Sequence, residues 1–422
     1  MDVSSTNTCT LPKWDELDVL NVEFGPNFYF ADMAKFTRNL EDFSTAFKQC
    51  SPNFKPAYSV KTNYLPAYIV QAHKMGWLIE VVSGFEFDLV RSYDIPGPDI
   101  IFNGPVKHPE EIHSALRAGA LLNIDSLQEA RDIMAFARDA GAPLCRVAIR
   151  CNFGDTLGVE SRFGIDVHSA EFTQTLQMLT QDAPSQLRFE GLHVHNCYPG
   201  KRPESYESMA KIVLEFIQAH GLSDKLLSLN LGGGFFSPMP LSMAAQFGGT
   251  IPSQQDYARA MAPALAPFFE PRLDCALILE PGLIILADTM TFLSRVFAIK
   301  SLNGRSEIIL SGSVYNVKPT KSRINMPFQV IAPERAPNPL KGRLSGFTCM
   351  EDDILHDDID DDIAVGDYIM FENTGAYSTV LTPPFIRLAP PVLALSESGN
   401  YQNPSVVCAA EQTESFLKKF HV

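Results

Sequence analysis

The sequence predicts an α/β protein in which a closed (β/α)8 barrel of the TIM type is joined to an additional, mostly β domain. Eight short apolar runs recur between residues 57 and 279, each followed by a helical pattern. Polar residues return at the ends of these runs, and the long helical patterns stop near residue 290. Eight β-α units in a row are what a closed parallel barrel requires. An open doubly wound sheet is the alternative, which the count of eight disfavours.

The eight predicted strands are nearly continuous apolar runs, as expected where helices cover both faces of a parallel sheet. They span residues 57–60, 78–82, 99–102, 121–124, 145–149, 189–194, 227–231 and 276–279. Ser126 and Glu129 have the spacing of a capping box, which predicts a helix from there to the vicinity of Gly141. His108 and Pro109 open another helix, with proline in its first turn.

The segments outside the barrel pattern predict the second domain. Residues 22–24 and 28–29 are strand-like and flank a Gly-Pro-Asn turn. Further strands, separated by turns, are expected at residues 292–301, 307–310, 368–371 and 386–388. The strongly acidic stretch 351–362 is expected to be a solvated loop. We therefore assign residues 1–31 and 291–422 to a β domain and residues 32–290 to the barrel.

Composition and charge disfavour several classes of protein. The 422 residues carry a formal net charge of −15, which argues against a nucleic-acid partner. No apolar run reaches membrane-spanning length, and residues 1–14 contain no secretion signal, so no membrane partner is expected. Eight cysteines are dispersed without a C-x-x-C pair. This spacing argues against a disulfide framework or a bound metal, and for reduced thiols in the cytoplasm.

Lys61 directly follows the first predicted strand, where the chain turns toward a helix opened by Pro66. A lysine at the carboxyl end of a buried strand can lose its proton at small cost, as an imine-forming lysine must. Taken alone, Lys61 is equally well explained as a surface lysine. The other strand ends carry Glu80, Asn103, Asp125, Arg150, His193, His195, the glycines 232–234 and Glu280. In a closed barrel these positions share one face, where active sites are built.

Three of these strand ends have residue types suited to a phosphorylated pyridine. Gly232, Gly233 and Gly234 allow backbone amides to approach a phosphate, although a tight turn would also explain them. The carboxylate of Glu280 is suited to holding a proton on a pyridine nitrogen, although a salt-bridged residue at the rim of the core would look the same. His195 is suited to lying flat against a ring, although a lone histidine is more often a hydrogen-bonded part of the structure.

Lysine, histidine, triple glycine and glutamate in this order resemble the fold-type III pyridoxal-phosphate decarboxylases, the family of diaminopimelate and ornithine decarboxylase. The resemblance covers nearly the whole chain, and the order of its eight segments makes it specific. The segments are YSVKTN at 58–63, EVVSG at 80–84, NGPVK at 103–107, GLHVH at 191–195, NLGGGF at 230–235, EPG at 280–282, Cys349, and GAY at 375–377. The resemblance implies an alanine racemase-like barrel and pyridoxal 5'-phosphate as cofactor.

By this resemblance, Lys61 forms the aldimine with the cofactor, and Glu80 lies beside it as a charge partner. His195 stacks on the cofactor ring, while Glu280 keeps the ring nitrogen protonated and the ring a strong electron sink. Cys349 of the partner subunit returns a proton to the α-carbon once carbon dioxide has left, which implies a homodimer with shared active sites. The other cofactor-binding residues implied are Arg150, Gly232, Gly233, Gly234 and Tyr377.

The sequence departs from the family pattern at two places on the cofactor side. Leu283 follows Glu280-Pro281-Gly282 where the family usually has arginine. After His195 the family usually has a small pair of residues, whereas this chain has Asn196, Cys197 and Tyr198. A contact to phosphate or to a substrate carboxylate must therefore come from elsewhere, and Lys201 or Arg202 is a candidate.

Two further departures concern the substrate. Met350 follows Cys349 where an acidic residue is usual, and Glu351 comes one step later. Lys318 stands before proline where the diaminopimelate enzymes have arginine. These changes favour an amino acid already joined to a carboxylate-bearing unit, as in the siderophore-pathway decarboxylases of the family. Tentative substrate residues are Lys318, Lys201, Arg202 and Glu351, since cations in a partly dry pocket bind carboxylates well.

Two other functions remain as alternatives. An amino-acid racemase or epimerase on the same fold would place a cation at the ring nitrogen, and Glu280 argues against it. A non-catalytic regulator related to the decarboxylases would be expected to lack the lysine or the cysteine, whereas Lys61 and Cys349 are both present.

Overall fold

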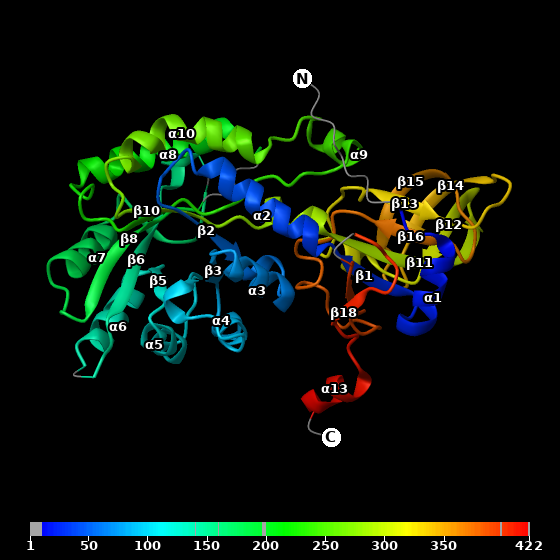
Figure 1. Ribbon diagram of the computed structural model, residues 1–422, viewed down its shortest axis with the longest axis horizontal. Coiled ribbons are helices and arrows are strands. Elements are labelled where there is room, and N and C mark those ends of the chain that lie inside the picture. The colour runs from blue at the N-terminus through cyan, green and yellow to red at the C-terminus, as the bar shows by residue number, and fades with distance from the viewer. Residues whose placement is uncertain (1–10, 140, 159, 196–199, 397–398, 421–422) are drawn as a thin grey trace. The chain divides into compact units, whose positions relative to one another are not determined.

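The computed structural model describes residues 11–420 except 140, 159, 196–199 and 397–398 (Figure 1). The chain divides into two compact units. The barrel unit comprises residues 39–236 and 252–285, and the β unit comprises residues 1–38, 237–251 and 286–422. Each unit is therefore assembled from segments that are separated in the sequence.

Eight parallel strands close into a barrel in the barrel unit, as the sequence predicts. Around the ring the order is β2, β3, β4, β5, β6, β8, β9 and β10, and β10 pairs with β2 to close it. The strands are β2 (Phe54–Ser59), β3 (Leu78–Val81), β4 (Ile100–Phe102), β5 (Leu121–Ile124), β6 (Cys145–Asn152), β8 (Leu187–His193), β9 (Ser228–Asn230) and β10 (Ala276–Leu279). A ninth strand, β7 (Ile165–Asp166), pairs with β6 alone. The (β/α)8 barrel is confirmed.

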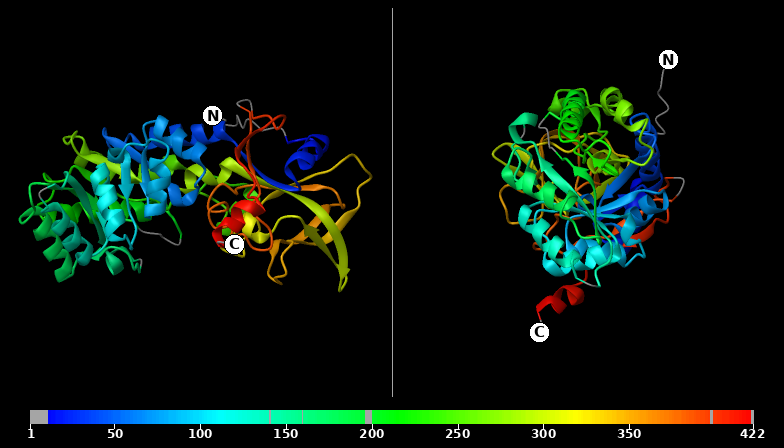
Figure 2. Two further views of the ribbon diagram at one scale, coloured as in Figure 1. Left: turned by 90° about the horizontal axis from the view of Figure 1, so that it is seen from below. Right: turned by 90° about the vertical axis from the view of Figure 1, so that its left-hand side faces the viewer.

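Helices surround the strands of the barrel, which the end-on view in Figure 2 shows. The helical segments are α2 (Met33–Phe47), η1 (Val60–Thr62), α3 (Pro66–Lys74), α4 (Gly84–Arg91), η2 (Gly97–Asp99), α5 (Pro109–Ala118), α6 (Leu127–Ala137), η3 (Gly154–Leu157), α7 (Ala170–Thr180), α8 (Pro203–Ala219), α10 (Gln254–Phe269) and α11 (Leu283–Leu286). The barrel interior is filled by Ala57, Ile101, Leu121, Ala148 and Ile278. Because the interior is packed rather than open, chemistry is confined to the ends of the strands.

The two helix starts that the sequence marks are found in the structure. Glu111 accepts a hydrogen bond from the His108 amide at 2.7 Å at the start of α5. Ser126 Oγ accepts from the Glu129 amide at 3.2 Å at the start of α6. The Glu129 side chain, however, accepts from the Asp125 amide one residue earlier, so the capping box is incomplete.

The β unit is built on a second sheet with the path β15, β14, β12, β11, β1, β17 and β18, to which β16 and β13 are attached. Its strands are β1 (Asn27–Ala31), β11 (Met290–Leu302), β12 (Arg305–Leu310), β13 (Phe328–Ile331), β14 (Pro339–Ser345), β15 (Ile354–Asp362), β16 (Tyr368–Phe371), β17 (Val392–Ala394) and β18 (Ser405–Cys408). Its helical segments are α1 (Trp14–Phe24), α9 (Leu241–Ala244), η4 (Ala245–Phe247), η5 (Ala287–Thr289), α12 (Val314–Val317), α13 (Thr413–Leu417) and η6 (Lys418–Phe420). Leu17, Phe28, Leu293 and Tyr368 are among the residues of its core.

Three of the local predictions for this unit are wrong. Residues 22–24 form the last turn of helix α1, whose buried Leu17 and Leu20 have helical spacing. Residues 386–388 form a bend in which Ile386 has φ +66°, within a proline-rich stretch that lacks amide donors. Residues 354–362 are strand β15 at the edge of the sheet, with Leu355 and Ile359 buried and four of its five aspartates exposed. Charged residues on an edge strand discourage pairing with other chains, which explains why an acidic run is compatible with a strand here.

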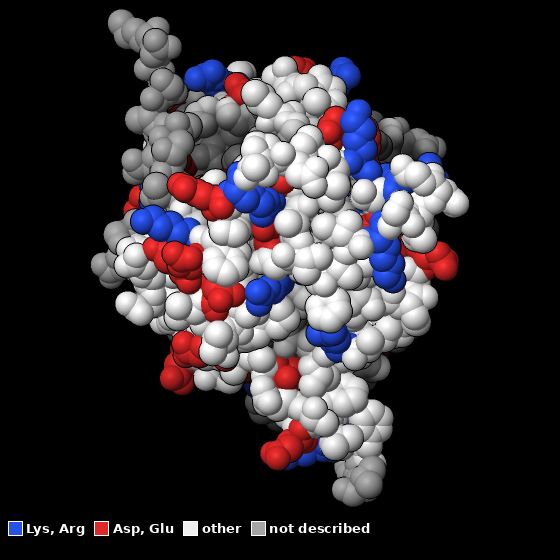
Figure 3. Space-filling model, turned by 90° about the vertical axis from the view of Figure 1, so that its right-hand side faces the viewer, with Lys and Arg blue, Asp and Glu red and all other residues white. Residues whose placement is uncertain are grey.

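The surface carries both signs of charge. Figure 3 shows acidic and basic side chains interspersed on the face turned to the viewer. Within the described residues, none of the helices combines the length and the apolar character that crossing a bilayer demands.

Candidate active site

The polar strand-end residues of the barrel meet at the carboxyl ends of its parallel strands. Lys61 lies in the short η1 turn after β2, and Glu80 lies within β3. Asn103 follows β4, and His195 comes two residues after the end of β8. Glu280 follows β10 directly. The hydrogen bonds described below join several of these side chains into one network.

Lys61 is paired with Glu80. The lysine Nζ donates to both carboxylate oxygens, at 2.7 and 2.6 Å. Ser59 Oγ donates to the same carboxylate at 2.5 Å. The Lys61 side chain is 36% exposed, whereas the Glu80 side chain is fully buried. An external molecule can therefore reach the amine while the carboxylate remains beneath it.

Glu280 is a buried carboxylate with two amide donors. Its Oε1 accepts hydrogen bonds from Asn103 Nδ2 at 2.9 Å and from Asn230 Nδ2 at 2.7 Å. Its Oε2 lies 3.5 Å from His193 Nε2. Burial by itself would raise the pKa of Glu280, but the charges of His193 and Lys61 and the bond from Asn103 outweigh it and hold the pKa well below its usual value. Glu280 is therefore ionised at neutral pH.

His195 is a neutral imidazole. Its Nδ1 accepts a hydrogen bond from the Gly233 amide at 3.1 Å, which places the ring proton on Nε2. Burial, together with the positive charge of Lys61, lowers the pKa of His195 to about 3, although Glu280 opposes the shift. A neutral, flat ring beside Lys61 and Glu280 is suited to stacking on a planar ligand.

The glycine turn after β9 is pressed against these groups. A Cβ on Gly233 would lie 2.1 Å from the carbonyl oxygen of Glu280, and one on Gly232 would lie 2.5 Å from His195 Nδ1. Gly232 and Gly234 also have positive φ, at +66° and +94°. Only glycine fits such a turn without displacing its neighbours.

Two amides of this turn donate to side chains of the protein, and the next two have no acceptor in the described part of the chain. The Gly232 amide donates to Asn230 Oδ1 at 2.9 Å, and the Gly233 amide donates to His195. The amides of Gly234 and Phe235 find no acceptor within the described part of the chain. Two adjacent unpaired amides at a turn are donors suited to a phosphate oxygen.

The sequence pattern of the pyridoxal-dependent decarboxylases, that of their pyridoxal binding domain, matches residues 33–287. The chain belongs to this family. Pyridoxal 5'-phosphate is its cofactor, and the chain is an amino acid decarboxylase. The barrel end fits that cofactor, because it holds a reachable lysine, an ionised carboxylate, a flat neutral ring and two unpaired amides.

Proteins similar to this chain include decarboxylases of the same family. A diaminopimelate decarboxylase of Actinosynnema pretiosum subsp. auranticum is 28% identical over 335 residues, which are 76% of this chain and 74% of the relative. The L-glutamyl-[BtrI acyl-carrier protein] decarboxylase of Niallia circulans is 25% identical over 442 residues, 95% of this chain and 97% of the relative. The crystal structure of a diaminopimelate decarboxylase from Methanocaldococcus jannaschii has the same fold, with a TM-score of 0.83 at 22% identity over 95% of this chain and 93% of that one.

Three further cationic residues predicted for the site, Arg150, Lys201 and Arg202, belong to the barrel unit of the decarboxylase. Arg150 ends 3.8 Å from Asp125 Oδ1, with its guanidinium 4.8 Å from the centre of the Phe163 ring. Lys201 Nζ lies 5.4 Å from the centre of the Phe236 ring. Arg202 is an exposed residue at the start of α8. Residues 196–198, which replace the usual small pair, lie outside the described residues.

The remaining predicted residues belong to the β unit of the decarboxylase. Cys349 is an exposed free thiol, and Glu351 is also exposed. Tyr377 has φ +66°, in the left-handed region. Lys318 is 8% exposed, and its Nζ donates to the Ile324 carbonyl at 2.9 Å. Burial lowers the pKa of Lys318, against the opposing charge of Asp357.

Several side chains of the network were not predicted as site residues. Asn103, Asn123 and Asn230 are buried amides at the carboxyl ends of β4, β5 and β9. Asn103 and Asn230 donate to the carboxylates, and Asn123 donates to Asn103. Glu86 is buried and accepts a hydrogen bond from the Val82 amide at 2.7 Å. Burial, reinforced by the charge of Glu80, raises the pKa of Glu86 to about 7. For the three asparagines the strand-end position was the signal, although the pair Asn103-Gly104 also indicates a plain turn.

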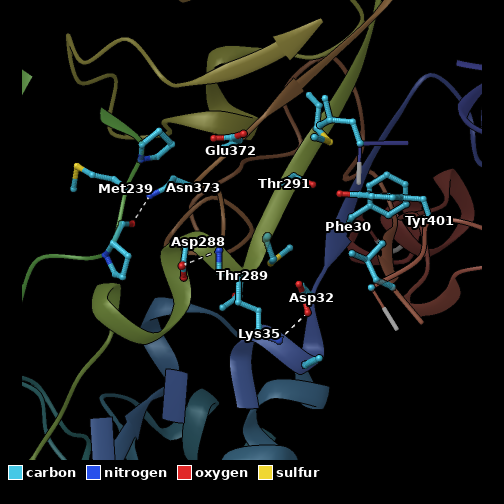
Figure 4. Close-up of a pocket in the computed structure, with 18 of the residues that line it drawn as sticks. Phe30, Asp32, Lys35, Met239, Asp288, Thr289, Thr291, Glu372, Asn373 and Tyr401 are labelled. Carbon is cyan, nitrogen blue, oxygen red and sulfur yellow. Dashed lines mark hydrogen bonds and ion pairs between the residues drawn. The ribbon is translucent and has the colours of Figure 1, made fainter. Parts of the chain in front are cut away.

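A cavity of about 770 Å³ in the β unit is a separate feature (Figure 4). Several of its polar groups already have partners. Lys35 Nζ lies 3.0 Å from Asp288, Asp32 accepts from the Lys35 amide at 2.7 Å, and Asn373 donates to the Pro238 carbonyl at 2.9 Å. We assign no chemistry to it. In the described residues, histidine, cysteine and carboxylate side chains form no cluster of three that is suited to a metal ion.

Proposed function

We propose that this decarboxylase removes the α-carboxylate of an amino acid or amino-acid adduct at the carboxyl end of its barrel, with Lys61, Glu280, His195 and Cys349 as catalytic residues. The observation that carries the assignment is the ionised, buried Glu280, which is linked through Asn103 to the Lys61–Glu80 pair. When bound, pyridoxal phosphate supplies an electron sink for the electrons that carbon dioxide leaves behind.

Each residue of the barrel has a defined task in this proposal. Lys61 Nζ is the covalent attachment point for the cofactor, and Glu80 holds that amine in place. Glu280 Oε1 or Oε2 holds a proton on the ring nitrogen, because an ionised carboxylate in a dry site is a strong acceptor. His195 supports the ring face with a neutral imidazole. Arg150 adds positive charge near these groups.

The phosphate would be held mainly by the end of the glycine turn. Since the Gly232 and Gly233 amides are committed to Asn230 and His195, these two glycines serve by allowing close approach, and the amides of Gly234 and Phe235 are the donors. We assign the hydroxyl of Tyr377 to the same phosphate, on the strength of the family resemblance.

The carboxylate of Glu280 also weighs against a racemase. A racemase of this fold would keep the ring nitrogen unprotonated with a cation, whereas here two amide donors and the nearby His193 surround an ionised Glu280. The presence of both Lys61 and Cys349 argues against a non-catalytic regulator.

We propose that the enzyme is a homodimer in which Cys349 of the partner subunit returns a proton to the α-carbon. The Cys349 thiol is exposed. The β unit that contains it also carries exposed apolar side chains. Leu381, Phe385 and Ile386 are 49%, 39% and 56% exposed. Tyr315 links this segment to the cysteine loop, because its ring packs on Phe385 at 6.4 Å and its hydroxyl donates to the sulfur of Met350 at 3.3 Å. A second copy of the chain would cover this apolar surface.

For the substrate, we propose an amino acid joined to a carboxylate-bearing unit, as in siderophore biosynthesis. Lys201 and Arg202 are the proposed carboxylate contacts, and Glu351 is the proposed contact to a distal amine. Lys318 is the weaker candidate, because its amine is buried and bonded to the Ile324 carbonyl. The relative from Niallia circulans is named for a glutamyl group carried on a protein, which supports an attached rather than a free amino acid.

We further propose that the enzyme works in the cytoplasm, since Cys50, Cys145, Cys151, Cys275, Cys349 and Cys408 are free thiols. The functional division would place the β domain at residues 1–31 and 291–422 and the pyridoxal-binding barrel at residues 32–290.

The test uses the purified holoenzyme and the Lys61→Ala variant as control. Borohydride reduction followed by peptide mass spectrometry should place the cofactor on Lys61. Labelling of a different lysine would overturn the assignment of the site. A panel of free amino acids and citrate-linked amino acids should then release carbon dioxide from the linked compounds in preference to the free ones. Turnover of free diaminopimelate or ornithine alone would overturn the substrate proposal and leave the site assignment intact.

A further inference from the structure

We propose that Asn103 is a positioning residue that joins the carboxylate serving Lys61 to the carboxylate serving the ring nitrogen. The proposal rests on the roles assigned above to Glu80 and Glu280. It adds that the two carboxylates are held as one unit by a single neutral side chain, and that their properties are coupled through it.

The geometry divides one amide group between two acids. Asn103 Nδ2 donates to Glu80 Oε1 at 2.8 Å and to Glu280 Oε1 at 2.9 Å. All three residues are buried, with exposures of 3%, 0% and 5%. A primary amide has two N–H donors, so one donor serves each carboxylate and none is left over. In the described part of the chain, Asn103 is the side chain that hydrogen-bonds to both acids, whereas Ser59 bonds to Glu80 and Asn230 bonds to Glu280.

The orientation of this amide is fixed from behind. Asn103 Oδ1 accepts a hydrogen bond from Asn123 Nδ2 at 2.5 Å. The backbone carbonyl of Asn123 accepts from Lys107 Nζ at 3.2 Å, which ties the main chain of this residue to an amine that lies 2.8 Å from Glu129. A flipped Asn103 amide would present its oxygen to two carboxylates and its nitrogen to another N–H group. The N–H donor of the Asn123 side chain therefore selects the orientation in which Asn103 donates to both acids.

A neutral donor is the residue type that this position needs. Two carboxylates bonded to the same nitrogen repel each other strongly in a dry site, and the two N–H dipoles between them offset that repulsion. A lysine or arginine there would instead neutralise Glu80 and Glu280 and weaken their hold on Lys61 and on a ring proton. The ionisable groups that face this cluster are Lys61, Glu80, Glu86, Arg150, His193, His195 and Glu280.

The arrangement also serves Glu80 when Lys61 moves. The lysine amine must leave Glu80 whenever it takes part in chemistry, which removes a charged partner from a fully buried carboxylate. Asn103 and Ser59 then remain as donors, at 2.8 and 2.5 Å. Without Asn103, Glu80 would keep one neutral donor, and an undersolvated buried carboxylate is costly.

The first test replaces the amide by a carboxyl of nearly the same shape. In Asn103→Asp the new carboxyl faces two carboxylates, so its pKa in the folded protein is raised above the ordinary value of about 4. Such a group contributes stability below about pH 4 and loses it as pH rises through the raised value. The melting temperature of the apoprotein, relative to wild type, should therefore fall progressively from pH 5 to pH 8. Asn103→Ala, which lacks the carboxyl, should show a difference that does not depend on pH.

Neutralising the neighbours one at a time identifies what the amide touches. The pH-dependent loss in Asn103→Asp should shrink on adding either Glu80→Gln or Glu280→Gln. The matched control is Asn230→Asp, which adjoins Glu280 alone, so its loss should shrink with Glu280→Gln and not with Glu80→Gln. An Asn103→Asp protein that is indifferent to Glu80→Gln, or whose melting curve runs parallel to that of Asn103→Ala, would overturn the proposal.

A second measurement applies if Asn103→Asp fails to fold. The dissociation constant for pyridoxal phosphate is measured for wild type, Glu80→Gln, Glu280→Gln and the double variant, and the set is repeated with Asn103→Ala. Coupling of about threefold or more between the two glutamates is expected with asparagine present, and coupling of a clearly different size with alanine, where only the direct repulsion of the two carboxylates is left. Equal coupling in both sets would refute the role of Asn103. Since neither measurement uses turnover, both remain informative if the proposed reaction or substrate is wrong.

Discussion

At the residue scale, Glu80 and Glu280 are buried carboxylates at the same end of the barrel, yet their surroundings suit different tasks. Glu80 has a lysine on both oxygens and a serine hydroxyl on one. Glu280 has two amide donors on one oxygen and faces His193 with the other. The first arrangement holds a cation in place, whereas the second keeps an acid ionised without placing a lysine on it.

Replacing Glu280 by glutamine should leave cofactor binding largely intact and slow decarboxylation by about a hundredfold or more. The neutral amide no longer stabilises a proton on the ring nitrogen, and charge stabilisation of that kind typically supplies a few kcal/mol to the transition state. Carbon dioxide release and cofactor absorbance measure the two effects separately. A variant with near-native turnover would mean that Glu280 is only structural.

The neutral state of His195 predicts a pH dependence of stability. Its pKa is about 3 in the folded protein, against about 6.5 in the unfolded chain. Between these values the unfolded chain binds a proton that the folded chain does not, so stability falls as pH falls through this window. His195→Gln retains an acceptor for the Gly233 amide and removes the titration. Its denaturation midpoint should therefore decline less than that of the wild-type apoprotein between pH 7 and pH 4.5, and equal declines would contradict the neutral assignment.

The site could be predicted from the sequence in its residue types but not in its bonding. Lys61, Glu80, His195 and Glu280 occupy strand ends, where chain position alone brings them to one face. The side-chain bonds of Asn103 depend on rotamers and on distances between strands, which no spacing in the sequence encodes. The same holds for the glycine turn, where the division of amides between internal and external acceptors follows from its backbone angles.

At the scale of elements, the strands of the barrel could be predicted because each is a short apolar run with turn residues after it. The acidic strand β15 could not be predicted, because five aspartates mask its two buried apolar residues. These residues become buried only when the strand pairs with β14. Residues 22–24 contain a β-branched residue and an aromatic one, which favour a strand locally. Packing of the Leu17 and Leu20 face decides for a helix instead.

The turn after β9 provides a prediction with an internal control. Gly233→Ala places a methyl group about 2 Å from the Glu280 carbonyl and should both lower the melting temperature of the apoprotein and weaken pyridoxal phosphate binding at least about tenfold. Gly141→Ala has open space and no positive φ, so it should be neutral or slightly stabilising. Calorimetry and cofactor titration measure both variants. Equal behaviour of the two would show that the turn can move away from Glu280 freely.

At the scale of the whole molecule, the count of eight β-α units was sufficient to predict the barrel, because few folds accommodate that number in a row. The topology of the β sheet was beyond prediction. Strand β1 lies between β11 and β17, pairing antiparallel with the one and parallel with the other. Pairings across such long stretches of chain leave no local pattern in the sequence.

The proposed dimer makes a prediction about mixtures of inactive proteins. Cys349→Ala should lose protonation at the α-carbon, and Lys61→Ala should lose the covalent attachment point. Mixed after subunit exchange, they should regain up to about a quarter of native activity, since half of the dimers are mixed and each mixed dimer has one intact site. Native mass spectrometry establishes the exchange. No recovery despite exchange would place Cys349 in the site of its own chain, or in none.

The position of β1 in the sheet delays its pairing during synthesis of the chain. The ribosome releases residues 27–31 early, whereas β11 at residues 290–302 and β17 at residues 392–394 emerge much later. The nascent amino-terminal strand must therefore wait, with both edges unpaired, while the intervening segments of the barrel are translated and can already fold. A strand exposed for so long is a point at which chaperones would be expected to engage the growing polypeptide.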